Sequence, residues 1–201
     1  MLDAKIRTAI DPLLDSWALR LTEIGIRANT VTLVGFAFGL LSLPFIAMHQ
    51  YGIGLLLILI NRFCDGLDGA IARQTAISDV GAYLDIVLDF IVYSGVVFAF
   101  SLAQPENAIF GAFLIFSFIG SGTSFLAFAI FAEKQKLTTE AQGTKSIYYL
   151  SGLAEGFETI LALVLMCLLP QFFWLLALGF AIICWVSTAF RIASSIKQLA
   201  V

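Results

Sequence analysis

Long apolar runs separated by short polar stretches dominate the chain from residue 31 onward. Each run is close to the roughly 20 residues that an α-helix needs to cross the hydrocarbon core of a bilayer. Two of the polar breaks contain Pro105 and Pro170, which interrupt helices. We therefore expect six transmembrane helices, at about Val31–Met48, Ile53–Ala72, Val80–Ser101, Ala108–Phe131, Ile147–Leu169 and Phe172–Ala193.

Residues 1–27 follow a different pattern, in which apolar side chains recur at close to the helical period of 3.6 residues with charged side chains between them. Leu14, Trp17, Leu21 and Ile24 continue this apolar stripe. Such a pattern predicts an amphipathic helix that lies in the membrane interface. Packing against a soluble partner is the alternative.

The composition supports a membrane protein and no second domain. The chain has 201 residues, is 60% hydrophobic and 12% charged, and has a mean hydropathy of +0.98, which is outside the range of soluble domains. We expect a single all-α integral membrane domain over residues 1–201, with the six-helix bundle at 31–193. The net charge of −3 and the scattered basic residues argue against nucleic acid as a partner.

The distribution of lysine and arginine predicts the orientation in the membrane. None of them lies in the expected loops 49–53, 102–107 and 169–172, and all but Arg62, which lies inside a span, fall toward the opposite side. By the positive-inside rule that side is cytoplasmic. We therefore expect a bacterial-type inner-membrane protein with both termini on the cytoplasmic side.

Four carboxylates stand inside this apolar sequence, at Asp65, Asp68, Asp85 and Asp89. Charged side chains at membrane depth are costly, so they indicate a functional site. The first two are three residues apart and the last two are four apart, so each pair shares one helix face. Two such faces turned toward each other would form a set of hard oxygen ligands suited to Mg²⁺ or Mn²⁺. The lysine and arginine distribution places these acids in the cytoplasmic half of the bilayer.

Intramembrane acids also mark the pathways of cation and proton transporters, and aspartate-rich helices serve intramembrane prenyltransferases. The chain lacks the internal inverted repeat that would support a transporter. Glycines and Arg73 beside the acids instead favour a site for a bulky diphosphate, because a guanidinium binds phosphate through charge-assisted hydrogen bonds.

The order Asp65-x2-Asp68-Gly69-x2-Ala72-Arg73, followed by Gly81-x3-Asp85-x3-Asp89, resembles the signature of the CDP-alcohol phosphotransferase (CDP-alcohol phosphatidyltransferase) family. The resemblance implies transfer of a phosphatidyl group from CDP-diacylglycerol to an alcohol, with release of CMP, in phospholipid biosynthesis. It also implies two divalent cations, Mg²⁺ or Mn²⁺, and a homodimer.

The resemblance assigns a role to each residue of the signature. Asp65 and Asp85 would bridge both cations, Asp68 would complete one, and Asp89 would bind the other and accept the proton of the attacking alcohol. The residues expected to contact the CDP-linked donor are Asn29, Thr30, Val31, Thr32, Gly69, Arg73 and Ser78. Asn29 and Thr30 can also cap the helix that begins there.

The acceptor alcohol is left open between glycerol 3-phosphate, an inositol phosphate and a neutral or amino alcohol. A phosphorylated acceptor needs further basic residues, for which Lys145 and Arg191 are candidates, beside Lys134 and Lys136. For Arg191 the alternative is an anchor at the membrane interface. Glu155 and Glu158 share one helix face and favour a neutral polyol or an amine instead. The alternative is that they pair with Arg191 or Lys145 in a structural role.

Overall fold

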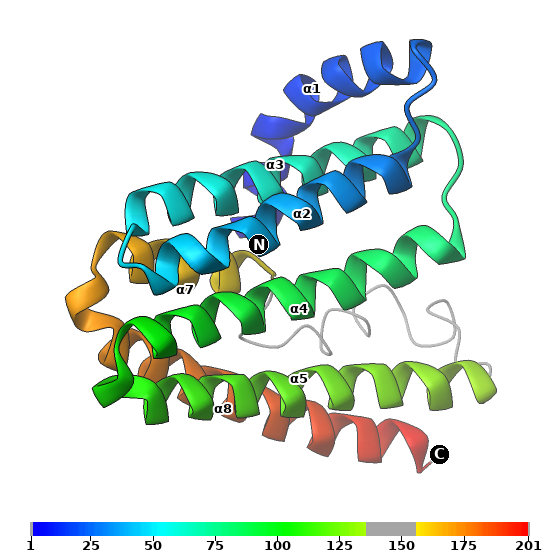
Figure 1. Ribbon diagram of the computed structural model, residues 1–201. Coiled ribbons are helices and arrows are strands. Elements are labelled where there is room, and N and C mark those ends of the chain that lie inside the picture. Colours follow the sequence, from blue (N-terminus) through cyan, green and yellow to red (C-terminus); the bar gives the residue numbers. More distant parts are fainter. Residues whose placement is uncertain (1, 136–155, 201) are drawn as a thin grey trace. The chain divides into compact units, whose positions relative to one another are not determined.

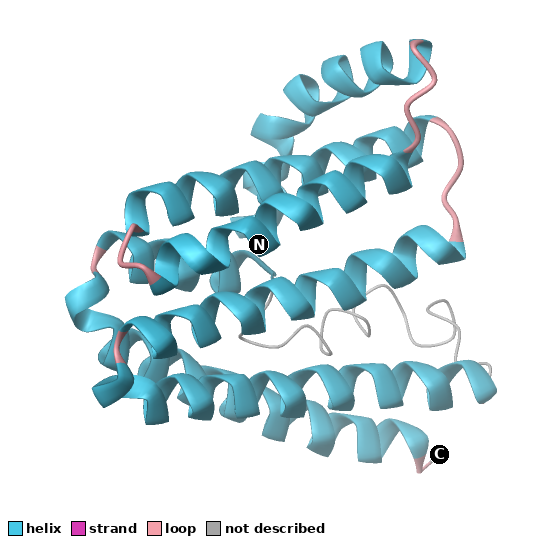
Figure 2. Cartoon of the chain, viewed as in Figure 1, coloured by secondary structure: helices cyan, strands magenta, loops and turns pink. Residues whose placement is uncertain are grey.

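The structure is a computed structural model that describes residues 2–135 and 156–200, and nearly all of these residues are helical (Figures 1 and 2). Within this part of the chain no strand occurs. The chain forms two compact units, Met1–Ala99 and Phe100–Val201.

The first unit contains three complete helices and most of a fourth. These are α1 (Leu2–Glu23), α2 (Ala28–Ala47), α3 (Tyr51–Gln74) and α4 (Asp79–Ala103). The turn after α1 has Gly25 at a φ of +80°, with its N–H bonded to the Thr22 carbonyl and the Ile26 N–H bonded to the Leu21 carbonyl. This pair of bonds is a Schellman motif, in which glycine takes the left-handed conformation without a Cβ clash.

The start of α2 differs from the prediction. The helix begins at Ala28 after Arg27, and no side chain caps its first N–H groups. Capping by Asn29 or Thr30 is therefore wrong, because both residues already lie within the first turn of the helix. Thr32 instead donates its hydroxyl proton back to the Ala28 carbonyl, at 3.2 Å.

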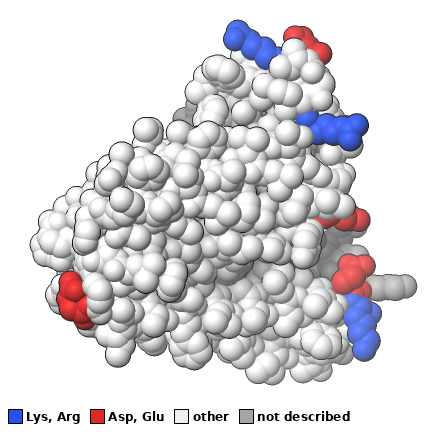
Figure 3. Space-filling model, in the orientation of Figure 1, with Lys and Arg blue, Asp and Glu red and all other residues white. Residues whose placement is uncertain are grey.

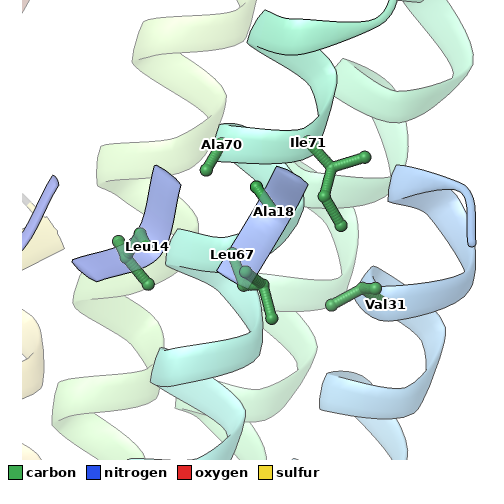
Figure 4. Packing of buried hydrophobic residues seen from close by; sticks show 6 residues of the cluster. All are labelled: Leu14, Ala18, Val31, Leu67, Ala70 and Ile71. Atoms are coloured by element: carbon green, nitrogen blue, oxygen red, sulfur yellow. The ribbon is translucent and has the colours of Figure 1, made fainter. Parts of the chain in front are cut away.

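Helix α1 packs on α3 through a small apolar cluster (Figure 4). Its buried members come from α1, α2 and α3, and they are Leu14, Ala18, Val31, Leu67, Ala70 and Ile71. A Cβ on Gly66 would lie 3.0 Å from the Leu14 side chain, so the glycine lets α1 approach α3 closely. Leu14 and Leu21 of the predicted apolar stripe thus take part in this contact together with Ala18, whereas Trp17 and Ile24 stay exposed. The place of the helix in a membrane interface stays a prediction.

Two glycines of α2 bring that helix against its neighbours in the first unit. A Cβ on Gly35 would lie 2.6 Å from Cys64 Cβ of α3, and one on Gly39 would lie 2.7 Å from Val92 of α4. Side chains at these positions would push the helices apart. The close approach matters because the acids predicted to form the site lie on α3 and α4.

The second unit continues from the end of α4 through a 3₁₀ turn, η1 (Pro105–Asn107), into α5 (Ala108–Lys134). It also contains α7 (Gly156–Leu168), a second 3₁₀ turn η2 (Pro170–Phe172) and α8 (Phe173–Leu199). Both helix breaks coincide with the prolines that predicted them. Helices α5 and α8 pack together through aromatic pairs, among them Phe116 with Trp185 and Phe118 with Phe180.

Large apolar side chains remain exposed along the helices that the sequence predicts to be transmembrane. Examples are Leu40 on α2, Phe98 on α4, Ile109 and Ile130 on α5, and Phe190 on α8. The face shown in Figure 3 is almost entirely uncharged, with charged groups at its margins. A surface of this kind needs lipid or another protein to cover it. Together with the apolar helices it makes the chain an integral membrane protein.

Four helical segments in the described part of the chain are long and apolar enough to cross a membrane: Ala28–Ala47, Asp79–Ala103, Pro105–Lys134 and Pro170–Leu199. Helix α3 carries Arg62, Asp65 and Asp68 within its apolar stretch, and the described part of the fifth expected span is the 13-residue α7. The remainder of that span, residues 147–155, lies outside the described residues. The count of six therefore stays a prediction.

Candidate active site

A pocket in the first unit brings together all four predicted acids. Residues of α2, α3 and α4 form its walls, and they are Thr32, Gly35, Phe36, Asn61, Arg62, Asp65, Asp68, Asp85, Leu88 and Asp89. The helical spacing explains the convergence, because each pair of acids occupies one face of its own helix. The pocket therefore confirms the prediction that the two acidic helix faces meet.

Three of the carboxylates approach one another closely enough to share a cation. One oxygen each from Asp65, Asp85 and Asp89 lies within 4.8 Å of the other two. The fourth acid, Asp68, is only 7% exposed, and its Oδ2 atom is buried with no hydrogen-bond partner among the residues that the structure describes. A buried carboxylate oxygen without a donor is unfavourable. The donor set is all oxygen, so it fits the hard cations Mg²⁺ and Mn²⁺.

Arg62, for which the sequence predicted no role, makes charge-assisted contacts with two acids of the pocket. Its guanidinium donates two parallel hydrogen bonds to Asp89, from Nη2 to Oδ1 at 2.5 Å and from Nη1 to Oδ2 at 3.0 Å. Its Nη1 atom is also 3.5 Å from Asp65 Oδ2. An arginine three residues before Asp65 in an apolar helix was the available signal, because that spacing places both on one face.

Two further residues that the sequence analysis missed hold this ion pair. The Tyr93 hydroxyl donates to Asp89 Oδ2 at 2.7 Å and lies 2.6 Å from Arg62 Nη1. Asn61 accepts a hydrogen bond from Arg62 Nε at 2.9 Å and donates its amide to the Gly35 carbonyl, also at 2.9 Å. The network therefore joins α2, α3 and α4, and it fixes the Asp89 carboxylate beside the other acids.

The residues expected to contact the donor fall in three different surroundings. Thr32 lines the pocket, while Val31 is buried in the apolar cluster beneath α1. Ser78 accepts a hydrogen bond from the Gly81 N–H at 3.1 Å and so caps the start of α4. A Cβ on Gly81 would also lie 3.1 Å from Asn29 Oδ1, which places Asn29 beside this turn. Thr30 is exposed.

Arg73 lies on α3 close to Gly69, where a Cβ would be 3.5 Å from its Nη1 atom. Its guanidinium is half exposed and lies 3.8 Å from both Asp11 and Asp15 of α1. Such exposed pairs at the limit of ion-pair distance contribute little to stability. The guanidinium can therefore leave them for a stronger anion.

The candidate acceptor residues lie in the second unit or outside the described part. Arg191 on α8 is 7% exposed, and its Nη1 donates to the Ser121 carbonyl at 2.9 Å, with the Ser124 hydroxyl at 3.4 Å. Its guanidinium also lies over the ring of Phe125, at 5.8 Å. A side chain that only anchors a helix at the membrane interface would be exposed, whereas Arg191 is buried and makes several polar contacts. Lys145, Lys136 and Glu155 lie outside the described residues, and Lys134 and Glu158 lie on α5 and α7.

Comparison with known proteins decides the class of this site. The sequence profile of the CDP-alcohol phosphatidyltransferase family matches residues 26–193. The chain belongs to the CDP-alcohol phosphatidyltransferase family. It is therefore a transferase of phospholipid biosynthesis, as the signature predicted, and the transporter and prenyltransferase alternatives are set aside.

Two known proteins are similar to this chain in sequence. The chain is 49% identical over 200 residues to the inner membrane protein YnjF of Escherichia coli K12, covering 99% of this chain and 97% of that protein. It is 34% identical over 101 residues to the archaetidylinositol phosphate synthase of Pyrococcus horikoshii, which is 49% of this chain and 53% of that enzyme.

Among solved structures, the fold is similar to that of Mycobacterium tuberculosis phosphatidylinositol phosphate synthase with CDP-DAG bound. The TM-score is 0.59 at 18% sequence identity, and the match covers 94% of this chain and 92% of that one. At this identity the likeness supports the transferase fold and no individual residue role.

Proposed function

We propose that the chain transfers a phosphatidyl group from CDP-diacylglycerol to an alcohol and releases CMP. The observation that carries the proposal is the meeting of Asp65, Asp68, Asp85 and Asp89 at one pocket, in the order of the family signature. A diphosphate donor carries negative charge, so it needs cations at a site that is itself acidic. The same acids that would repel the donor alone can therefore bind it through metal ions.

The donor set fits two divalent cations, Mg²⁺ or Mn²⁺. Asp65 and Asp85 would be shared by both, while Asp68 and Asp89 would each bind one. The uncompensated Oδ2 atom of Asp68 and the close approach of the other three carboxylates support this assignment. Bound there, the cations would neutralise the phosphate oxygens on which negative charge builds up during transfer.

Asp89 is the proposed general base. The alcohol oxygen attacks the phosphorus that carries the diacylglycerol group, and the bond from that phosphorus to the oxygen of the CMP phosphate breaks. The alcohol proton goes to an Asp89 carboxylate oxygen, and CMP leaves as an anion. Arg62 and Tyr93 hold this carboxylate in one orientation at the pocket wall.

The nucleotide side of the donor would lie between the start of α2 and the turn before α4. Arg73 would exchange its distant contacts with Asp11 and Asp15 for the diphosphate, a stronger and bidentate partner. Gly69 leaves room beside that arginine, and Ser78, Asn29 and Thr32 offer polar groups nearby. The CDP-DAG bound in the similar mycobacterial crystal structure supports a CDP-linked lipid as the donor.

The exposed apolar helices would keep the diacylglycerol chains in lipid while the head group enters the pocket. The lysine and arginine distribution supports six spans with both termini and the pocket on the cytoplasmic side. We further propose a homodimer, which the family resemblance implies.

The acceptor class is the open part of this proposal. One relative is named archaetidylinositol phosphate synthase and the similar structure is a phosphatidylinositol phosphate synthase, so an inositol phosphate is the first acceptor to test. Arg191 is the proposed contact for an acceptor phosphate, with Lys145 as a second candidate. Glycerol 3-phosphate and neutral or amino alcohols complete the panel.

The test is CMP release by the purified chain in detergent with CDP-diacylglycerol, MgCl₂ or MnCl₂ and each alcohol in turn. We expect CMP only when donor, cation and one acceptor class are all present. Asp85→Asn should abolish release, whereas Asp79→Asn, a matched change at the exposed start of α4, should not. Full release in the presence of EDTA, or by Asp85→Asn, would refute the metal-dependent mechanism.

A further inference from the structure

Arg62 is a buried cation in a pocket proposed to bind cations, and holding Asp89 in place does not by itself require a positive charge there. Its side chain is 10% exposed, against 33% for Asp65 and 24% for Asp89, its two acidic neighbours. A buried arginine without paired acids would be strongly unfavourable. Here the acids neutralise it, and it neutralises part of their charge.

The surroundings of Arg62 hold it in one place. Its Nε donates to Asn61, both terminal nitrogens donate to Asp89, and the guanidinium stacks at 5.0 Å over the Tyr93 ring. Asn61 is itself 4% exposed and bonded to the α2 backbone at Gly35. The arginine is thus a built part of the pocket and differs from a surface side chain that finds an acid by chance.

The acids that bind Arg62 overlap with the proposed metal ligands. Asp65 and Asp89 are two of the three carboxylates whose oxygens lie within 4.8 Å of one another. Both oxygens of Asp89 accept hydrogen bonds from the guanidinium. A divalent ion bound to these carboxylates would lie close to a fixed positive charge, and like charges repel strongly in a poorly hydrated site.

We propose that Arg62 is an internal counter-cation that competes with a divalent ion for Asp89 and Asp65. It neutralises this side of the pocket when the metal is absent, and it weakens its ion pair with Asp89 when the metal binds there. Arg62 is in this sense a positioning residue that sets the metal affinity of the site. The inference rests on the proposed function, because it assumes that the acids bind divalent ions.

The proposal predicts that removing the charge of Arg62 makes metal binding tighter, although the change also removes four hydrogen bonds. A residue with only a structural role would give the opposite result, since its loss would loosen the acids and weaken binding. Arg62→Lys separates the two readings, because lysine keeps the charge and loses the parallel hydrogen bonds. We therefore expect Arg62→Lys to bind metal about as weakly as the unchanged chain.

The experiment is a titration of the purified full chain in detergent with MnCl₂ alone, in which electron paramagnetic resonance reports the free Mn²⁺. Arg62→Gln should bind its weaker Mn²⁺ ion more tightly, on the order of tenfold. Tyr93→Phe, which removes one donor from Asp89, should shift the affinity in the same direction by about twofold to threefold. Arg20→Gln, the same substitution at an exposed position of α1, should leave it unchanged.

Each outcome decides the matter. An unchanged or weaker Mn²⁺ affinity in a folded Arg62→Gln, with the unchanged chain binding Mn²⁺, would overturn the counter-cation role and leave the proposed function intact. An affinity in Arg62→Lys as tight as that in Arg62→Gln would overturn it as well. If none of the proteins binds Mn²⁺, both proposals fail. Binding by Arg62→Gln at concentrations where the unchanged chain binds none would support the competition directly. If Arg62→Gln does not fold, the direction of the Tyr93→Phe shift decides.

Discussion

Replacing Asp89 with asparagine separates the two roles that this residue has in the account, as a base and as the partner of Arg62. Asparagine keeps the shape of the side chain but carries no charge. The change leaves the Arg62 guanidinium with Asp65, at 3.5 Å, as its nearest acid. Breaking a buried ion pair from one side costs about 3–5 kcal/mol when both partners are fully buried.

The side chains of Arg62 and Asp89 are 10% and 24% exposed, so partial hydration reduces this cost. We therefore expect Asp89→Asn to lower the free energy of unfolding by about 2–3 kcal/mol in the metal-free protein. For a chain of this size that corresponds to a fall in Tm of about 5–10 °C. The same variant should release no CMP, because the carboxylate proposed to accept the alcohol proton is gone and the other three acids are assigned to the cations.

The double variant Asp89→Asn with Arg62→Gln supplies the control. Removing the orphaned cation should restore at least half of the lost stability, while CMP release stays absent. Thermal unfolding followed by tryptophan fluorescence in detergent with EDTA measures the first quantity, and the CMP assay measures the second. An unchanged Tm in Asp89→Asn would refute the ion-pair argument, and turnover at the original rate would refute the base assignment.

Three further substitutions test separate parts of the account. Gly39→Ala should lower Tm, at a cost of about 1–3 kcal/mol in stability, because its Cβ would lie 2.7 Å from Val92. Gly52→Ala, where a Cβ meets open space, should leave Tm unchanged, and equal Tm values for the two variants would contradict the close helix contact. Arg73→Gln should raise KM for CDP-diacylglycerol about tenfold in a steady-state assay with little change in kcat, and an unchanged KM would remove it from donor binding. Ser78→Ala should lower the free energy of unfolding by about 1 kcal/mol in thermal unfolding through loss of the α4 cap, and a stability loss below about 0.3 kcal/mol would contradict that role.

The sequence predicted the meeting of the acids because helical spacing is a local property. Asp65 with Asp68, and Asp85 with Asp89, share a face whatever surrounds them, and only the pairing of α3 with α4 had to be assumed. The proline breaks at Pro105 and Pro170 were predictable for the same reason. The family signature then fixed the class of reaction, which the comparisons confirm.

The contacts of Arg62 could not be predicted in the same way. Its partners Asp89 and Tyr93 lie 27 and 31 residues further along the chain on α4, so their meeting depends on how α4 lies beside α2 and α3. The approach of α4 to α2 depends in turn on the fit of Gly39 against Val92, which no periodicity reveals. The start of α2 was mispredicted locally, since Asn29 and Thr30 suit a cap position and yet the helix begins at Ala28, two residues earlier than a cap at Asn29 requires.

The central claim is that acids from α3 and α4 bind divalent ions that contact the diphosphate of a nucleotide-linked lipid. Electron–nuclear double resonance on Mn²⁺ bound to the purified chain with CDP-diacylglycerol tests it most directly, because coupling to ³¹P requires the ion to be in contact with phosphate oxygen. We predict ³¹P coupling in the unchanged chain and its loss in Asp65→Asn. Bound Mn²⁺ with no ³¹P coupling, or a coupling that survives in Asp65→Asn, would contradict the account.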